Sequence, residues 1–281
     1  MYEKSHVRFD VGVVFGQSFF FDVPRTLSDA VSEGWVQQTQ ADGLPVTSVS
    51  MYCYSDNIVC NFYDSDGDVA GCCKLSLMIS VLPKDKFTPH FDNMEDFGFT
   101  TWTVDGAEYW TLQQYFTTEE ILSSRANRAN ENKITENGGV WVVGPYKEVV
   151  QISNSTSAII DEGLFTRQAC IPWMGRHYYY KMTPELSCTD EPMFPWFPLV
   201  ESGELVATGF VVPATLNLDS GARDWPRSQD AGWFEHPNEI AVKAIVPDGP
   251  QCLYDLAASP GLVTMHIYYI DQPWLISCIF Q

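Results

Sequence analysis

The sequence predicts a strand-rich fold, either all-β or α+β dominated by β-structure, in which tandem-duplicated antiparallel sheets form a barrel or a sandwich with a few short helices. Three observations lead to this prediction. Apolar, β-branched and aromatic residues fall in many short runs of strand length. Turn-forming Gly, Asp and Pro residues separate those runs. The order of the runs in the second half of the chain repeats their order in the first half.

Strands account for most of the first half. One or two strands are predicted in 7–23. One strand is predicted in each of the following ranges: 44–54, 57–63, 69–81, 109–116, 140–143 and 148–152. Asp66-Gly67 predicts a hairpin turn, because Gly supplies the positive φ that a tight turn needs. Calcium is a poor alternative for the aspartates at 64–68, since Gly67 stands at the fourth loop position and Leu75 at the twelfth.

Two short helices are predicted between these strands. The first covers 26–34, where Thr26 or Ser28 can cap the start and Gly34 can end the helix. The second covers 117–125, where Thr117 and Glu120 have the spacing of a capping box. The fold class is therefore not purely β.

A tandem duplication is predicted from collinear matches between the halves. Residues 171–180 match 44–51, 197–207 match 62–70, 239–246 match the strand at 108–115, 252–256 match the helix at 119–122, and 263–277 match the hairpin at 140–152. We expect one β-rich repeat in 1–154 and a second in 155–281, or one fused barrel-like domain. Coincidence between similar hairpins is the alternative.

Charge limits the partners that the protein can have. The chain has 281 residues and a formal net charge of −20. Nucleic acid and anionic membranes are bound through clusters of Lys and Arg, which this chain lacks, so neither is an expected partner. No apolar run is long enough for a transmembrane helix, so no membrane insertion is expected. The acidity serves solubility or attracts a cationic ligand.

Cysteine usage bears on the compartment. There are eight Cys and no C-x-x-C pair, which removes zinc-ribbon and thioredoxin motifs. The even count and the sequon at 154–156 favour disulfides and a secreted or extracellular protein, with buried free thiols as the alternative. Residues 1–10 lack the apolar core of a signal peptide, so a cytosolic protein and a trimmed secreted chain both remain open.

The candidate site is centred on residues 170–181, where Cys, Trp, Gly, His and three consecutive Tyr occur together. Side chains alternate along a strand, so His177, Tyr179 and Lys181 share one face, as do His266 and Tyr268. If both faces turn inward, the two His and two Tyr meet in one apolar cavity. They could then act as general acids and bases, and we take these four as catalytic candidates.

The same histidines could instead hold a metal. The candidate ligands of a single divalent ion are His177, His236, His266 and Glu239, with Glu235 beside them. Their spacing fits no compact metal motif. Core histidines hydrogen-bonded to Tyr or to the backbone are the alternative.

Aromatic and basic residues of the second half suggest a ligand pocket. The candidate ligand-binding residues are Trp173, Arg176, Lys181, Trp196, Phe197 and Trp233. Such residues suit a small apolar or aromatic molecule, and the alternative is that the aromatic ones are core.

The function hypothesis is a small-molecule-binding β-barrel protein. It favours an enzyme of unknown reaction that uses the His and Tyr residues above. Nucleophile-elbow, dinucleotide-binding and P-loop motifs are missing from the chain. A non-catalytic carrier of a lipophilic ligand and an extracellular disulfide-stabilised recognition or structural protein are the alternatives.

Overall fold

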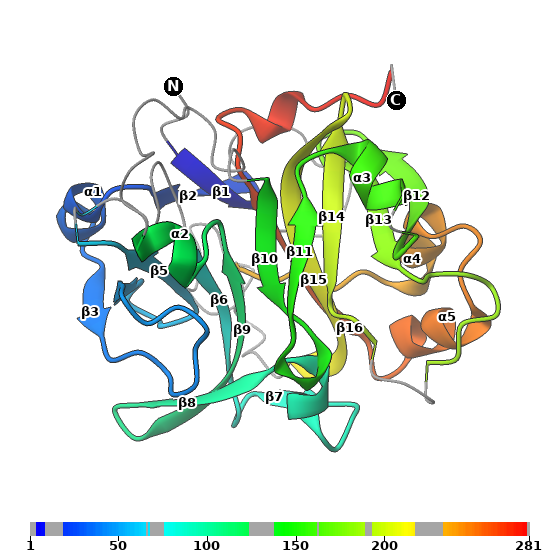
Figure 1. Ribbon diagram of the computed structural model, residues 1–281. Helices are drawn as coiled ribbons and strands as arrows, with labels where there is room; N and C mark the ends of the chain where they lie inside the picture. The colour runs from blue at the N-terminus through cyan, green and yellow to red at the C-terminus, as the bar shows by residue number, and fades with distance from the viewer. Residues whose placement is uncertain are drawn as a thin grey trace.

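The strands form two antiparallel sheets of eight strands each, and neither sheet closes into a barrel (Figure 1). The computed structural model describes residues 4–8, 19–65, 67, 76–123, 138–161, 163–188, 193–216 and 233–279. The sheets lie face to face around a shared core. The predicted β-rich fold class is confirmed, and of the two predicted architectures the sandwich is the one observed.

Sheet 1 is built from the first half of the chain. Its order is β11-β10-β9-β6-β5-β4-β3, with β8 paired to β9. The strands are β3 Val36–Gln38, β4 Ser50–Cys53, β5 Val59–Tyr63, β6 Ser76–Pro83, β8 Thr100–Val104, β9 Ala107–Tyr115, β10 Gly139–Val143 and β11 Val149–Ser153.

Sheet 2 combines strands from the second half of the chain with strands from the N-terminal end of the chain. Its order is β12-β13-β14-β15-β16-β1-β2, with β7 paired to β15. The strands are β12 Phe165–Ile171, β13 Gly175–Tyr180, β14 Trp196–Glu201, β15 Glu204–Leu216, β16 Leu262–Tyr268, β1 Lys4–Arg8, β2 Phe20–Pro24 and β7 Phe87–Pro89. The pairing of β1 with β16 therefore joins the two ends of the chain in one sheet.

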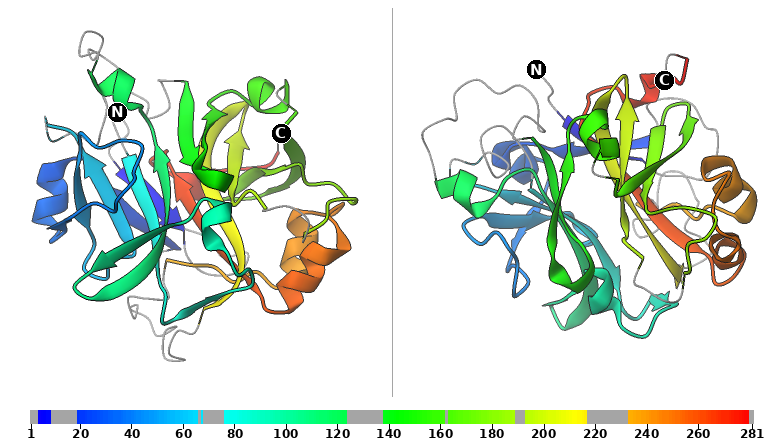
Figure 2. Two further views of the ribbon diagram at one scale, coloured as in Figure 1. Left: turned by 60° about the horizontal axis from the view of Figure 1, so that its bottom comes forward. Right: turned by 45° about the vertical axis from the view of Figure 1, so that its right-hand side comes forward.

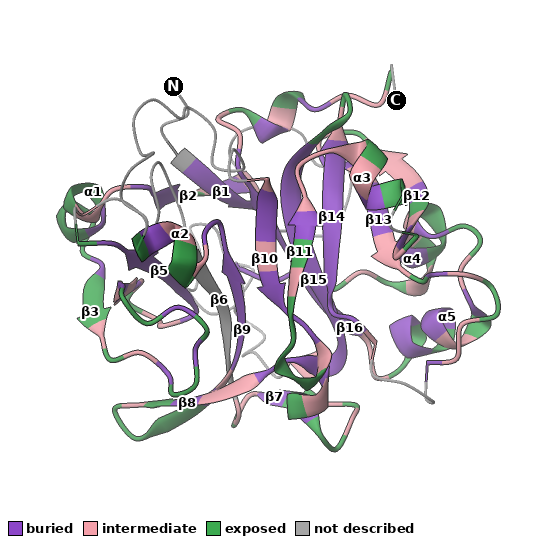
Figure 3. Ribbon diagram, viewed as in Figure 1, coloured by how far each residue is buried: buried purple, intermediate pink, exposed green. Residues whose placement is uncertain are grey.

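Apolar side chains of both sheets fill the space between them, as the buried strands of Figure 3 show. Leu112 of sheet 1 and Phe210 and Met265 of sheet 2 are fully buried there. Several polar links cross this core. Thr208 Oγ1 donates to Gln114 Oε1 at 2.5 Å, and Trp196 Nε1 donates to the Val143 carbonyl at 3.0 Å. Because alternate strand residues point to opposite faces, each sheet also has an outer face that needs its own cover.

Five short helices lie among the described residues: α1 Leu27–Ser32, α2 Glu119–Ser123, α3 Thr156–Asp161, α4 Glu239–Ile245 and α5 Gln251–Ala258. Helices α4 and α5 cover the outer face of sheet 2. Figure 2 shows the pair at the side of the sandwich. Of the two predicted caps, Thr26 and Ser28, it is Thr26 that caps α1, with its hydroxyl accepting from the Asp29 amide at 3.1 Å. In the described ranges, no helix has both the length and the apolar character needed to cross a bilayer.

Four local predictions were wrong. Residues 239–245 form helix α4 rather than a strand, because Asn238 caps them and Glu239 pairs with Lys243 one turn later. Residues 273–275 form a 3₁₀ turn, and 172–174 form the turn between β12 and β13. Thr118, not Thr117, accepts the α2 amide of Ile121.

Two other predictions fall partly outside the described residues. The turn predicted at Gly16 lies in 9–18, and the strand predicted at 69–81 is described only from Ser76 onward. Gly67 itself has φ 80°, as its predicted turn requires. The predicted hairpin at 140–152 is confirmed, and residues 197–207, which were matched to the predicted hairpin turn at 62–70, form a hairpin as well.

The two halves show matching local arrangements. The first amide of α1, at Leu27, donates to the Gly67 carbonyl at 2.8 Å, and that of α3, at Thr156, donates to the Gly203 carbonyl at 3.1 Å. The halves do not have separate cores, because β1 and β2 complete the sheet of the second half. The tandem duplication stays a prediction that these parallels support.

Three disulfides join described cysteines. Cys53–Cys60 joins β4 to β5, Cys170–Cys278 starts from β12 of sheet 2, and Cys188–Cys252 involves the roof helix α5. The last two hold the C-terminal segment against β12 and the loop after β13 against α5. Cys72 and Cys73 lie outside the described residues.

Replacing the cap of α1 should destabilise the protein. Thr26→Ala removes the acceptor for the Asp29 amide and is expected to lower the free energy of unfolding by about 1 kcal/mol, measured by urea denaturation. Thr26→Ser keeps the hydroxyl and should stay near wild type. Equal losses in both variants would contradict the capping role.

Candidate functional site

Polar side chains from three strands meet on the outer face of sheet 2. His177 lies on β13, His266 on β16 and Arg8 on β1, where Arg8 is directly opposite His266 in the strand register. All three are buried. The alternation predicted for β13 is confirmed, because Tyr178 packs in the core between the sheets, whereas Tyr179 packs in the cluster on the outer face.

A glycine allows the two histidines to approach. Gly209 of β15 is in register with His266 and with Phe197 of β14. A Cβ at Gly209 would meet the Phe197 ring and the Met265 carbonyl oxygen, the latter at 2.7 Å. The Phe197 ring therefore occupies the place of a side chain there, and the ring centroids of His177 and His266 lie 5.9 Å apart beside it.

Glu235 joins Arg8 and His266 in a buried network. Its Oε1 lies 2.7 Å from Arg8 Nη1 and 3.1 Å from His266 Nδ1. Two backbone hydrogen bonds with Thr264, of 2.8 and 2.9 Å, attach Glu235 beside β16. Burial disfavours the charged carboxylate, but Arg8 and His266 outweigh it and hold the pKa of Glu235 below its usual range.

The network assigns the proton of His266. An ionised carboxylate only accepts hydrogen bonds, so His266 Nδ1 must carry the hydrogen that it shares with Glu235. In the neutral ring, Nε2 is then an acceptor, and among the described residues the ring's hydrogen bond is the one that Nδ1 makes to Glu235. A carboxylate that fixes an imidazole in this way is the arrangement of an acid–base site or of a polar ligand contact.

His177 is completely buried and is not placed to transfer a proton. It is 0% exposed, and neither ring nitrogen has a partner of hydrogen-bond geometry among the described residues. Burial, followed by the neighbouring His266, lowers the pKa of His177 to about 3, against a weaker opposing effect of backbone groups at Ala169 and Gly175. The ring is therefore neutral at physiological pH and is no proton donor there.

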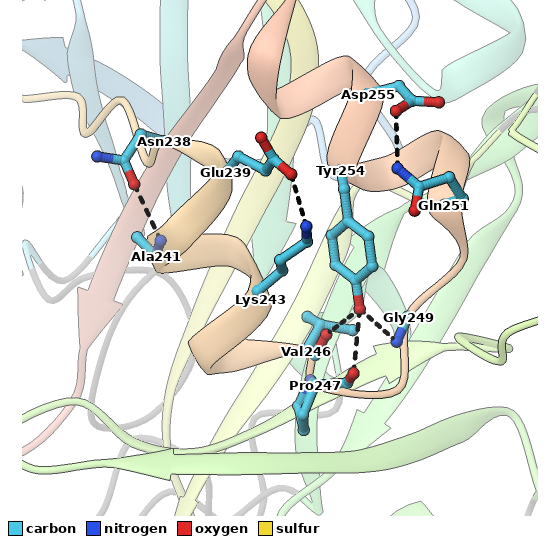
Figure 4. A network of polar contacts seen from close by, with 10 residues as sticks. All are labelled: Asn238, Glu239, Ala241, Lys243, Val246, Pro247, Gly249, Gln251, Tyr254 and Asp255. Carbon is cyan, nitrogen blue, oxygen red and sulfur yellow. Dashed lines mark hydrogen bonds and ion pairs between the residues drawn. The ribbon is translucent and has the colours of Figure 1, made fainter.

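Helices α4 and α5 together form a roof over this face, and polar contacts connect the two helices (Figure 4). The Tyr254 hydroxyl donates to the Val246 carbonyl at 2.7 Å and accepts from the Gly249 amide at 2.8 Å. Asn238 accepts from the Ala241 amide at the start of α4. These bonds brace the roof internally, and its contact with the sheet is apolar.

A small cavity remains between the roof and the sheet. Its volume is about 40 Å³, and its lining includes Glu235, His266, Tyr179, Met174, Met182 and Val246. One water needs roughly 10–15 Å³ of such space, so the cavity has room for about three waters as it stands. Its wall is almost wholly apolar, and Glu235 and His266 form its polar end.

The other predicted site residues lie in different places. Tyr179 lines the cavity, and the buried Tyr268 hydroxyl donates to the Met174 carbonyl at 3.3 Å. Phe197 is adjacent to His177, with ring centroids 5.8 Å apart. Trp196 and Trp233 belong to the core between the sheets, where Trp233 stacks on Phe21.

Three predicted ligand-binding residues lie away from the cavity. Trp173 occupies the β12–β13 turn with φ 54°. Lys181 is exposed just beyond the end of β13. Arg176 lines a separate hollow, because the residue before His177 points to the opposite face of the strand.

The four predicted metal ligands do not come together. His236 is exposed, and Glu239 forms an ion pair of 2.6 Å with Lys243 on α4. His177 and His266 lie edge to face in the buried cluster. Within the ranges that the structure describes, no group of three or more His, Cys, Asp or Glu is placed to hold a metal ion.

Arg8 is the member of the network that sequence reasoning missed. It lies 227 residues from Glu235 in the sequence, and no local sequence pattern predicts a contact between residues so far apart. The signal available was the alternation of β1, in which His6 and Arg8 occupy one face and Ser5 and Val7 the other.

Comparisons with family models, with curated proteins and with solved structures found no match to this chain.

The sealed imidazole predicts a pH dependence of stability. Unfolded His177 titrates near pH 6.5 and the folded residue near 3, so only the unfolded chain binds this proton in between. Stability is then complete above about pH 6.5 and falls towards pH 3. His177→Phe should remove about 1.4 kcal/mol per pH unit of that slope, measured by urea denaturation from pH 4 to 7.

Exposed His90 supplies the matched control, since His90→Phe should leave the slope unchanged. Phe fills a similar volume and leaves no unpaired nitrogen, so His177→Phe should keep or raise stability at pH 7. An unchanged slope in His177→Phe would show that the imidazole is not sealed.

Proposed function

We propose that this protein binds a small, largely apolar molecule with one polar group, in the cavity between sheet 2 and the roof. The carrying observation is that the Glu235–His266 pair lies at one end of an apolar cavity, where His266 hydrogen-bonds to Glu235 through Nδ1 and no described residue hydrogen-bonds to Nε2. A neutral imidazole acceptor in such surroundings suits a hydroxyl or amide donor on the ligand. Arg8 contributes indirectly, because it keeps Glu235 ionised.

The ligand requires the cavity to widen. Well-formed ligand pockets measure roughly 300–1,000 Å³, far above the 40 Å³ present here. Met174 and Met182 line the cavity, and their unbranched side chains can change rotamer at low cost. The packing between the roof and sheet 2 is apolar among the described residues, and apolar contacts can rearrange without loss of hydrogen bonds. We therefore propose a ligand the size of one aromatic ring.

An enzyme that moves a proton is the second candidate. It is favoured by the 3.1 Å contact between Glu235 and His266 Nδ1, which holds Nε2 as a base. The apolar wall would exclude water from the reacting group. Tyr179 is the nearest predicted partner on the wall, and burial raises its pKa, so that it stays a neutral donor.

We further propose a secreted or extracellular location, because disulfides persist in oxidising compartments. A purely structural or recognition role is the competing proposal. It is favoured by the sealed environment of His177 and by the small cavity volume.

Phenol and toluene test the binding proposal. Both should shift the methyl NMR signals of Met174 and Met182, and phenol should bind more tightly because its hydroxyl donates to His266 Nε2. His266→Phe should weaken phenol binding about tenfold and leave toluene unaffected. His236→Phe, an exposed neighbour in sequence, is the control. Absence of shifts with both compounds at millimolar concentration would favour the structural role.

Acetophenone tests the proton-transfer candidate. In D₂O a base at His266 should exchange the methyl protons of acetophenone for deuterium faster than buffer does, as followed by ¹H NMR. His266→Phe should abolish the excess rate, whereas His236→Phe should retain it. Binding of phenol without such exchange would identify a carrier rather than an enzyme.

A further inference from the structure

A second concave region lies on the opposite face of β13 from the cavity. It is an open hollow of about 480 Å³ beside α3, lined by residues of α3, β12, β13, β14 and the β14–β15 turn. Figure 1 shows α3 beside β12 and β13 at the upper right of the sandwich. Its volume falls within the range of small-molecule pockets, unlike that of the cavity under the roof.

The hollow is lined by hydrogen-bond donors. Arg167 of β12 and Arg176 of β13 line it together with Tyr178, which is directly opposite Arg167 in the register. Tyr178 is 2% exposed, and it lies in the lining of the hollow. Thr156 also lines the hollow, and its buried hydroxyl has no hydrogen-bond partner among the described residues.

The local charge is positive in a strongly acidic protein. The chain has 16 Lys and Arg against 36 Asp and Glu. Burial, and then the charge of Arg167, lower the pKa of Arg176. Burial raises the pKa of Tyr178, while Arg167 and Arg176 oppose that rise. Both effects agree with the lining of the hollow, which brings the two guanidinium groups near each other and near the phenol.

We propose that this hollow binds an organic oxyanion, a carboxylate or phosphate ester with a small apolar body. Guanidinium groups match the paired oxygens of such anions, and the hydroxyls of Tyr178 and Thr156 supply further donors. Ile160 and Val200 offer apolar walls for the body. The site is independent of the cavity under the roof, because Tyr178 and His177 point to opposite faces of β13.

Phenyl phosphate, benzoate and neutral benzyl alcohol test this site by isothermal titration and by NMR of labelled protein. At least one anion should bind, with shifts confined to β12, β13 and α3, and benzyl alcohol should not. Comparison of the two anions separates a phosphate ester from a carboxylate ligand. Equal binding of benzyl alcohol, or no binding of either anion at 10 mM, would overturn the proposal.

Variants locate the binding. Arg167→Gln, at an exposed position, should weaken the bound anion about tenfold, and Tyr178→Phe several-fold. Lys147→Gln removes a cation in the turn between β10 and β11, and it should change affinity less than twofold. Arg176 also donates to the Gln168 carbonyl at 2.9 Å, so Arg167→Gln is the decisive variant. Unchanged affinity in Arg167→Gln would exclude this hollow as the site.

Discussion

The pairing of β1 with β16 is the interaction on which the rest of the structure depends. It places Val7 in the core between the sheets and turns Arg8 to the outer face, opposite His266. Without it, sheet 2 would lose both β1 and β2, and Glu235 would lose the cation that keeps it ionised. One strand therefore supports both the core of the sandwich and the polar end of the cavity.

The buried network of Arg8, Glu235 and His266 needs all of its charged members to be present. Burying a charge is costly, and a buried ion pair barely repays the cost, but removal of one partner typically costs about 3–5 kcal/mol. Arg8 is 1% exposed, and Glu235 is buried as well. A network of this kind contributes little net stability, and its presence beside an apolar cavity agrees better with a role in orienting His266 than with a role in folding alone.

Short-range patterns predicted much of the fold. Alternation gave the strands and the opposite faces of His177 and Tyr178, and turn residues gave the hairpins at 140–152 and 197–207. Helix α4 was misassigned because its apolar residues also fit a strand, although the Glu239–Lys243 spacing indicated a helix. The site was predicted only in part, since Arg8 reaches Glu235 through contacts between distant parts of the chain, and since Trp196 and Trp233 are core residues that resemble pocket residues by type.

The order in which the chain is synthesised affects when β1 can pair with β16. His6 pairs with Tyr268, so β1 emerges from the ribosome long before its partner exists. Until β16 is made, the N-terminal hairpin has no sheet to join, and sheet 2 presents an unpaired edge. Closing so long a loop is slow, because chain entropy must be lost before the strand contacts form. The cavity under the roof is therefore complete only after β16 has been made and has paired with β1, and until then a nascent chain would depend on protection of that edge.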